Sequence, residues 1–362
     1  MATVGLAILA RLASRWGFSP ISLYLLAGLA FGKGGILPFM LSKDFIEIGA
    51  HIGILLLLFM LGLEYSGEQL KQSIRGGVAG IALDFVLNFP PGLIAGLLLG
   101  WKLLPAVLLG GVTFISSSGI IARMLSELGR LSAPETPTLL SVLVLEDLVM
   151  AVYLPLVAVL IVGGGPGRIV LSVAIAMATV IVVLFLAIRY GQSLSALVAH
   201  QSDEIILLTT FGAVLLVAGF AQRLQVSAAI GAFLVGIAVS GPIAEQSHKL
   251  FSPLRDLFAA TFFFFFGLEI DPRSLTPVLL PALALAVVTT LTKVLTGFLA
   301  TRKLQAGARV RFRAGLTLVA RGEFSMVIAG LGVALEPRLG SLSAAYVLIM
   351  AVAGAFLVRL IR

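Results

Sequence analysis

The sequence predicts an all-α protein that crosses a membrane about thirteen times and contains two inverted repeats with crossing, interrupted helices. Three observations support this fold class. Of the 362 residues, 59% are hydrophobic and only 12% are charged, whereas soluble proteins contain about 25% charged residues. Long apolar segments recur along the whole chain with short polar connections, as in polytopic helical membrane proteins. Two motifs of the first half recur in the second half in the same order.

Thirteen apolar segments can be distinguished, and most reach the roughly 20 residues that a helix needs to cross a bilayer. The first is the weakest, because Arg11 and Arg15 interrupt its apolar character near the end. The predicted segments are residues 1–15, 20–37, 45–64, 77–100, 104–126, 136–162, 168–190, 203–222, 227–243, 255–270, 275–301, 311–333 and 341–361.

The basic residues set the predicted orientation. With the N-terminus outside, sixteen Lys and Arg residues fall in cytoplasmic connections and seven in external ones, and an excess on the cytoplasmic side is the rule. We therefore expect a multi-pass protein of the cell membrane with a cytoplasmic C-terminus. The whole chain, 1–362, is expected to form one transmembrane unit without a soluble regulatory domain. The net charge of +8 then needs no nucleic-acid partner, because the basic residues lie mainly in short connections.

An internal repeat links the two halves of the chain. Residues 15–30 align without gaps to residues 223–238, and residues 59–64 align to 264–269. These matches shift the pattern by seven crossings, and an odd shift inverts the second copy relative to the membrane. Inverted repeats are typical of secondary transporters, whose ion site lies at mid-membrane where broken helices meet. The repeats are expected to cover approximately residues 1–162 and 203–361.

The same shift pairs segment 104–126 with segment 311–333, and both contain residues that interrupt helices. Residues 110–119 read Gly-Gly-Val-Thr-Phe-Ile-Ser-Ser-Ser-Gly, and residues 315–325 read Gly-Leu-Thr-Leu-Val-Ala-Arg-Gly-Glu-Phe-Ser. Glycines and clustered hydroxyls weaken a helix and can bond to the freed backbone groups. We therefore predict two discontinuous helices, whose exposed carbonyls could face cations.

Two adjacent acids lie inside the apolar segment 136–162. A carboxylate at bilayer depth costs several kcal/mol, so such residues are rare and usually line an ion or proton path. Glu146 and Asp147 are difficult to explain as packing. They indicate a protein that moves ions, although a buried acid satisfied by a neighbouring helix is the alternative.

Other classes of function find less support. An intramembrane hydrolase would need its two acids on separate helices, and no nucleophilic catalytic set is visible, so the chain is not expected to be an enzyme. The sequence has no cysteines, and its three histidines lack the spacing of metal ligands. No cofactor is expected beyond the transported ions. Two alternatives on the same scaffold are a cation channel or uniporter and a cation sensor that has lost transport.

The motifs resemble the monovalent cation:proton antiporter-2 family, especially its Kef-type potassium/proton members with an NhaA-like fold. The likeness runs through essentially the whole chain in order. It rests on Gly62-Leu-Glu64, Ser116-Ser-Ser-Gly-Ile-Ile121 with Glu127, Leu145-Glu-Asp147 with Pro155, Lys293, and Gly322-Glu-Phe324.

This resemblance implies a homodimer of thirteen-helix subunits in the lipid bilayer, each with a dimerisation domain and a six-helix core that moves like an elevator. It also implies that Asp147 is the carrier that binds cation and proton in turn, and that Lys293 pairs with Glu146. Sodium-type members usually have Asp-Asp and well-known Kef members Gln-Asp, so the Glu-Asp pair does not fix the cation. Potassium is favoured and sodium is the alternative. Nucleotide regulation would require a separate cytoplasmic subunit.

Further residues complete the predicted site. Thr113, Ser116, Ser117 and Ser118 are candidate neutral ligands of the cation, or bond back to their own helix. Glu323 could bind the cation or cap a half-helix, and Arg321 could neutralise Glu323 or Glu127. Glu146 could pair with Lys293, join the site or face another helix; the salt bridge to Lys293 is preferred. Asp84, in the middle of segment 77–100, could make a polar contact at a domain interface.

Overall fold

The computed structural model is helical, without strands, in the part of the chain that it describes. These residues are 2–16, 20–32, 67–163, 199–223, 228–239, 242–304 and 307–360, with scattered positions between 48 and 63 and between 167 and 195. The segment expected at 168–190 and much of that at 45–64 fall outside the described residues, so the count of thirteen crossings stays a prediction.

Five helices of the described part are long and apolar enough to cross a membrane. Large apolar side chains such as Leu98 and Leu280 are exposed on two of them, as expected for surfaces that face lipid. The five spans are Gly77–Leu98, Thr136–Val162, Asp203–Arg223, Pro272–Leu304 and Pro337–Arg359.

The chain divides into two compact units. The first comprises Met1–Met40, Ser73–Asp147 and Phe263–Arg362, and the second comprises Leu41–Gln72 and Leu148–Phe262. The division falls within α4, α7 and α11. The helices are α1 (Ala2–Trp16), α2 (Pro20–Phe31), α4 (Gly67–Leu98), α5 (Leu103–Phe114), α6 (Ser118–Glu127), α7 (Thr136–Val162), α9 (Asp203–Arg223), α10 (Ala228–Ala238), α11 (Pro242–Glu269), η1 (Pro272–Ser274), η2 (Thr276–Val278), α12 (Leu279–Ala300), η3 (Arg302–Leu304), α13 (Ala308–Thr317), α14 (Glu323–Gly332) and α15 (Pro337–Leu360).

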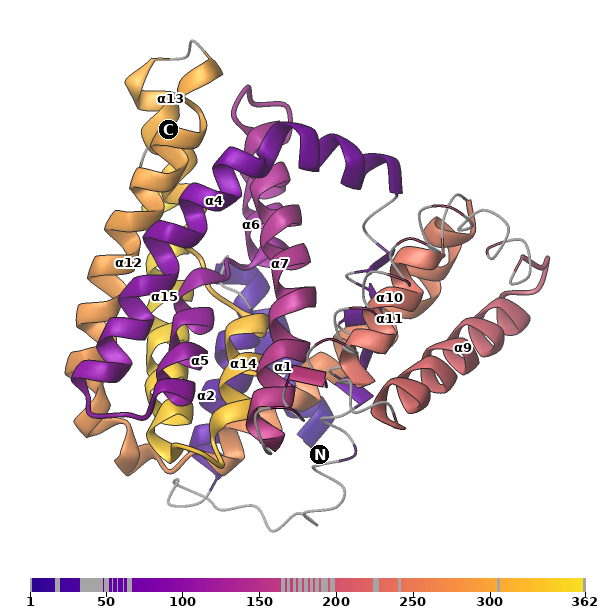
Figure 1. The fold of residues 1–362 in the computed structure, drawn as a ribbon, viewed down its shortest axis with the longest axis horizontal. Helices are drawn as coiled ribbons and strands as arrows, with labels where there is room; N and C mark the ends of the chain where they lie inside the picture. The colour runs from indigo at the N-terminus through magenta and orange to yellow at the C-terminus, as the bar shows by residue number, and fades with distance from the viewer. Residues whose placement is uncertain are drawn as a thin grey trace. The chain divides into compact units, whose positions relative to one another are not determined.

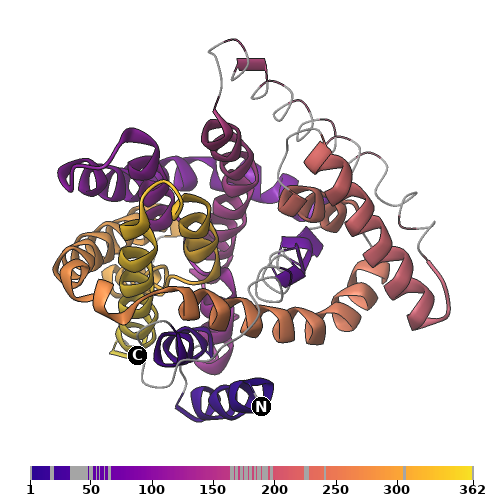
Figure 2. The ribbon, with the colours of Figure 1, turned by 90° about the horizontal axis from the view of Figure 1, so that it is seen from below.

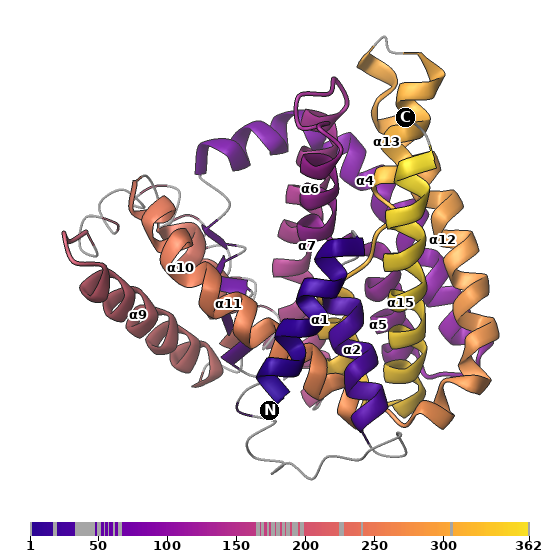
Figure 3. The same ribbon diagram turned by 180° about the vertical axis from the view of Figure 1, so that it is seen from behind.

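The first unit is a bundle in which α12 packs against both α13 and α15, and α14 packs against α5 and α15 (Figure 1). The orange and yellow C-terminal helices gather together in the view of Figure 2, and α1 lies beside α2 (Figure 3). A buried apolar cluster joins four of these elements through Ile121 of α6, Leu143 of α7, Ala314 of α13 and Val358 of α15. The cluster therefore includes one half-helix from each interruption, α6 and α13.

The second unit is built around α9, α10 and the first part of α11. Its apolar core includes Val214, Val235 and Phe251, and the ring of Phe251 meets that of Phe59 edge-on with centroids 5.0 Å apart. The sequence places a polar connection between residues 243 and 255, but the structure continues α11 through this stretch, including Pro253. The physical reason is that Phe251, in the middle of the expected connection, is buried in the core.

Two glycines of the predicted repeat make matching close contacts, one in each unit. A Cβ at Gly28 of α2 would lie 2.7 Å from Gly267 Cα and too close to the carbonyl oxygen of Phe264. A Cβ at Gly236 of α10 would lie 2.7 Å from Gly62 Cα and equally close to the carbonyl of Phe59. Gly28 aligns with Gly236, and residues 59–64 align with 264–269, so each copy packs against the partner motif of the other. Only glycine permits this approach of two backbones.

Substitution of either glycine tests this packing. Gly28→Ala and Gly236→Ala should each lower the free energy of unfolding by about 1–3 kcal/mol, because the added methyl group forces the two backbones apart. The measurement is thermal unfolding of the purified protein in detergent.

Gly212→Ala in α9 is the matched control, since a Cβ there meets nothing within 4 Å. It should be neutral or stabilising, because alanine favours a helix by about 1 kcal/mol over glycine. Equal melting temperatures for all three variants would contradict the close contacts.

Candidate functional site

Both predicted interruptions are present in the first unit. Between α5 and α6, residues 115–117 leave the helix, and Ile115 is extended with φ −70° and ψ 129°. Between α13 and α14, residues 318–322 leave the helix. Each half-helix contains only 10 or 12 residues, which at 1.5 Å per residue covers about 15–18 Å, or half of a bilayer core. The free ends of the half-helices therefore lie deep within the predicted spans.

The two interruptions contact each other through their backbones. Ser117 N donates to Ala320 O at 3.0 Å, and Ser116 Oγ donates to Leu318 O at 3.2 Å. Further along, Ser325 Oγ of α14 donates to Val112 O of α5 at 3.0 Å. These bonds replace the helical partners that the interruptions remove, as buried backbone groups require.

Arg321 is fully buried between the ends of α5 and α13. Its Nη2 donates to Thr113 O at 2.9 Å, and its Nη1 donates to Leu318 O and Val319 O, each at 3.1 Å. These carbonyls lie at the C-terminal ends of two half-helices, where the helix dipole favours a positive charge. Carbonyls that the sequence analysis considered as possible cation contacts are thus bonded to a guanidinium. The side chains of Glu323 and Glu127 lie outside the description, so their pairing with Arg321 stays a prediction.

Glu146 of α7 accepts hydrogen bonds from Ser116, in the interruption just before α6. Its Oε2 lies 2.5 Å from Ser116 N, and its Oε1 lies 3.1 Å from Ser116 Oγ. A carboxylate at the N-terminal end of a half-helix interacts favourably with the positive end of the helix dipole. The carboxylate of Glu146 therefore joins α7 to the first interruption.

The ion pair that the sequence analysis prefers is present. Lys293 Nζ of α12 lies 2.9 Å from Glu146 Oε1, and both side chains are fully buried. The ammonium also lies 5.6 Å from the centroid of the Phe114 ring, within reach of a cation–π interaction. Glu146 thus pairs with Lys293 and contacts Ser116 at the same time, and its part in a cation site stays a prediction.

Asp84 of α4 is a further member of this cluster. Lys293 Nζ donates to Asp84 Oδ1 at 2.8 Å and to Asp84 Oδ2 at 2.9 Å. The sequence predicts a polar contact for Asp84 at a domain interface but does not identify Lys293 as its partner, which lies in the same unit. The sequence feature that could have identified this cluster is Asn88, one helical turn after Asp84. The two residues place polar side chains on one face of an otherwise apolar helix.

Asn88 holds Asp84 in position. Its Nδ2 donates to Asp84 Oδ1 at 2.9 Å and to Thr296 Oγ1 at 3.0 Å, and its Oδ1 accepts from Thr292 Oγ1 at 2.7 Å. Thr113 Oγ1 donates to Asn88 O at 2.9 Å. A buried polar network of this kind is stable because its members satisfy one another.

The remaining candidate residues lie around the first interruption or beside it. Asp147 follows Glu146 on α7 and is 1% exposed, and its side chain leaves the helix about 100° away from that of Glu146. Ser117 Oγ accepts from Ile120 N at 3.4 Å, and Ser118 begins α6. Thr113 also bonds back to Gly110 O at 3.1 Å, as the alternative reading of these hydroxyls expects. Their role as cation ligands stays a prediction.

A second ion pair, between a buried acid and a partly exposed arginine, lies away from this cluster and was not predicted from the sequence. Glu135, just before α7, accepts from Arg313 of α13 at 2.6 Å. In the preceding connection, Arg130 Nη1 donates to Val358 O at 3.3 Å. Burial, with the nearby charge of Arg313, lowers the pKa of Arg130 below its usual value. These contacts fix the end of α7 that precedes the two adjacent acids.

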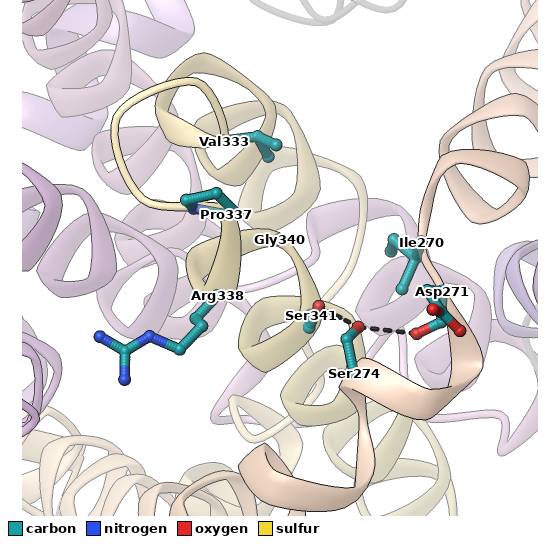
Figure 4. Close-up of a pocket in the computed structure, with 8 residues that line it drawn as sticks. All are labelled: Ile270, Asp271, Ser274, Val333, Pro337, Arg338, Gly340 and Ser341. Carbon is teal, nitrogen blue, oxygen red and sulfur yellow. Dashed lines mark hydrogen bonds between the residues drawn. The ribbon is translucent and has the colours of Figure 1, made fainter. Parts of the chain in front are cut away.

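A cavity of about 270 Å³ lies near η1 and the start of α15 (Figure 4). Ser274 and Ser341 point toward each other there, with their hydroxyl oxygens 2.6 Å apart, whereas Arg338 extends away from them. None of the predicted ion-binding residues lines this cavity. Among the described residues, no group of three or more His, Cys, Asp or Glu side chains could hold a metal ion together.

Solved structures of similar fold include the sodium proton antiporter MjNhaP1 from Methanocaldococcus jannaschii at pH 8. The TM-score is 0.74 over 99% of this chain and 94% of that chain, at 17% sequence identity. At this identity the likeness shows the fold alone, and it agrees with the predicted fold class.

Comparison with curated proteins identifies relatives that are transporters rather than enzymes. The K(+)/H(+) antiporter subunit KhtU of Bacillus subtilis is 36% identical over 364 residues, covering 98% of this chain and 90% of the relative. The ammonium/H(+) antiporter subunit AmhT of Alkalihalophilus pseudofirmus is 31% identical over 325 residues, covering 86% and 80% respectively. Residues 2–362 match the family described as sodium/hydrogen exchanger, transmembrane. The chain therefore belongs to this transmembrane sodium/hydrogen exchanger family.

Proposed function

We propose that this protein exchanges a monovalent cation, with K⁺ favoured over Na⁺, for protons by alternating access, and that Asp147 binds the cation and the proton in turn. The observation that carries the proposal is a buried Asp147 next to Glu146, whose carboxylate bonds to the interrupted α5–α6 segment. In its ionised form Asp147 attracts a cation. A proton that binds Asp147 removes this attraction, so the two compete for one group.

The charges around the acid pair support this role. Lys293 of α12 and Arg321, between α13 and α14, are both fully buried and positively charged. Arg321 occupies carbonyls of Thr113, Leu318 and Val319. We infer that it serves as a fixed positive charge at the two helix ends, which leaves carboxylates and hydroxyls as the groups available to the transported ion. Ser117, Ser118 and Glu323 remain candidate ligands on this reading.

The relatives support the choice of cation. The names of KhtU and AmhT specify potassium and ammonium, while the probable Na(+)/H(+) antiporter GerT of Bacillus cereus is 25% identical over 311 residues. Potassium and ammonium ions are similar in size, and both are larger than sodium. The relatives of higher identity therefore favour a site for the larger cations.

The assembly is part of the same proposal. We infer two inverted repeats, because Gly28 and Gly236 make equivalent contacts with equivalent partners. The family resemblance supports a homodimer in the cell membrane with an elevator-like core, an external N-terminus and a cytoplasmic C-terminus. The word subunit in the names of KhtU and AmhT supports a separate cytoplasmic partner that regulates exchange.

Asp147→Asn should abolish exchange in proteoliposomes, because the amide cannot alternate between a charged and a protonated state. The measurement is recovery of a quenched pH-sensitive dye when the cation is added. Asp256→Asn is the matched control, since Asp256 is exposed and forms a surface ion pair with the neighbouring Arg255. Exchange by Asp147→Asn at the rate of the control would refute the carrier role.

A cation series tests the substrate. We expect proton exchange with potassium, rubidium and ammonium at lower concentrations than with sodium or lithium, measured by the same dye in the wild-type protein. Repeating the series at clamped voltage separates exchange from a channel or uniporter, which would pass a large current without moving protons. Cation binding without any flux would instead favour a sensor.

Arg321→Gln should lower the free energy of unfolding by about 3 kcal/mol or more, because it leaves buried carbonyls without their charged donor. Arg338→Gln is the control, since Arg338 is exposed and pairs with Glu336. Thermal unfolding in detergent measures both. A melting temperature of Arg321→Gln equal to that of the control would mean that the guanidinium does not hold the interruptions together.

A further inference from the structure

The ammonium of Lys293 has three N–H donors, and all three are directed at carboxylates. Two go to Asp84, at 2.8 and 2.9 Å, and one goes to Glu146, at 2.9 Å. All three side chains are completely buried. Lys293 therefore donates to both carboxylate oxygens of Asp84 and to only one carboxylate oxygen of Glu146.

The two carboxylates differ in how they are held. Asp84 is fixed to the contact between α4 and α12, because Asn88 bonds to it and is itself bonded to Thr292 and Thr296. Glu146 bonds instead to Ser116 in the first interruption and precedes Asp147 on α7. One partner of Lys293 thus belongs to a satisfied network within two continuous helices, and the other belongs to the ion site.

Burial makes this difference important. A buried charge that loses its partner costs about 3–5 kcal/mol. If Glu146 were the sole partner of Lys293, any movement of Glu146 toward a cation would leave the ammonium unpaired. Asp84 removes that cost, because its bidentate contact remains when Glu146 leaves.

We propose that Asp84 is the permanent counter-charge of Lys293, a positioning residue that frees Glu146 to leave the lysine and contact the transported cation beside Asp147. This inference rests on the proposed function. It assigns different roles to two acids that contact the same ammonium: Asp84 holds Lys293, and Glu146 alternates between Lys293 and the cation. Arg321, bonded to carbonyls, takes no part in this exchange of partners.

The decisive experiment measures the cation concentration for half-maximal exchange, KM, and the maximal rate in proteoliposomes of the full chain. In Asp84→Asn, Lys293 has Glu146 as its charged partner and holds it away from the cation. KM should then rise about tenfold, which corresponds to about 1.4 kcal/mol of binding free energy, while the maximal rate changes less.

The double variant Asp84→Asn with Lys293→Gln removes both members of the fixed pair and should restore KM to within about threefold of the wild type. This double variant removes one buried negative and one buried positive charge, so it leaves the net charge of the cluster unchanged and serves as the test if Asp84→Asn alone does not fold. A KM in the double variant as high as in Asp84→Asn would overturn the proposal. An unchanged KM in folded Asp84→Asn would do the same, because a purely structural role lowers the amount of folded protein without changing cation affinity.

Glu135→Gln is the matched control. It neutralises another buried acid of the same unit, whose partner Arg313 lies away from the site, and it should leave KM unchanged even if it lowers the melting temperature. The result is separable from a failure of the proposed function. If the wild type exchanges and Asp147→Asn does not, while Asp84→Asn keeps the wild-type KM, only the role of Asp84 is wrong.

Discussion

The structure around the site depends on the high cost of placing charge in an apolar membrane. Lys293 and Arg321 are completely buried, and neither could remain there without a dense set of acceptors. Asp84 and Glu146 supply them for the lysine, and backbone carbonyls of two half-helices supply them for the arginine. The interruptions and the buried guanidinium of Arg321 therefore stabilise each other, because the interruptions expose carbonyl acceptors and the guanidinium requires them.

The sequence predicted the parts of this arrangement that depend on local chemistry. Glycines and clustered serines located both interruptions to within a few residues, and a lysine too deep to reach solvent was paired correctly with Glu146. These inferences work because a polar group inside an apolar span must find a partner, and few partners are present.

What the sequence missed depends on contacts between distant segments. The bond from Lys293 to Asp84 joins residues 209 positions apart, and the bond from Arg321 to Thr113 O joins residues 208 positions apart. Which buried acid a lysine pairs with, or whether an arginine bonds to an acid or to a carbonyl, depends on how distant helices pack against each other. The continuation of α11 through residues 243–255 was not predicted for a related reason. The many polar side chains there suggest a connection, although Phe251 among them is buried in the core.

The position of Arg321 limits how the molecule can move. The guanidinium of Arg321 bonds to the ends of both α5 and α13. Separating these ends would therefore leave a buried charge and three buried carbonyls without hydrogen-bond partners. Motions that keep these two helix ends together therefore cost much less free energy than motions that separate them. The ends of α5 and α13 are therefore expected to move together as one body, with deformation confined to the connections around them.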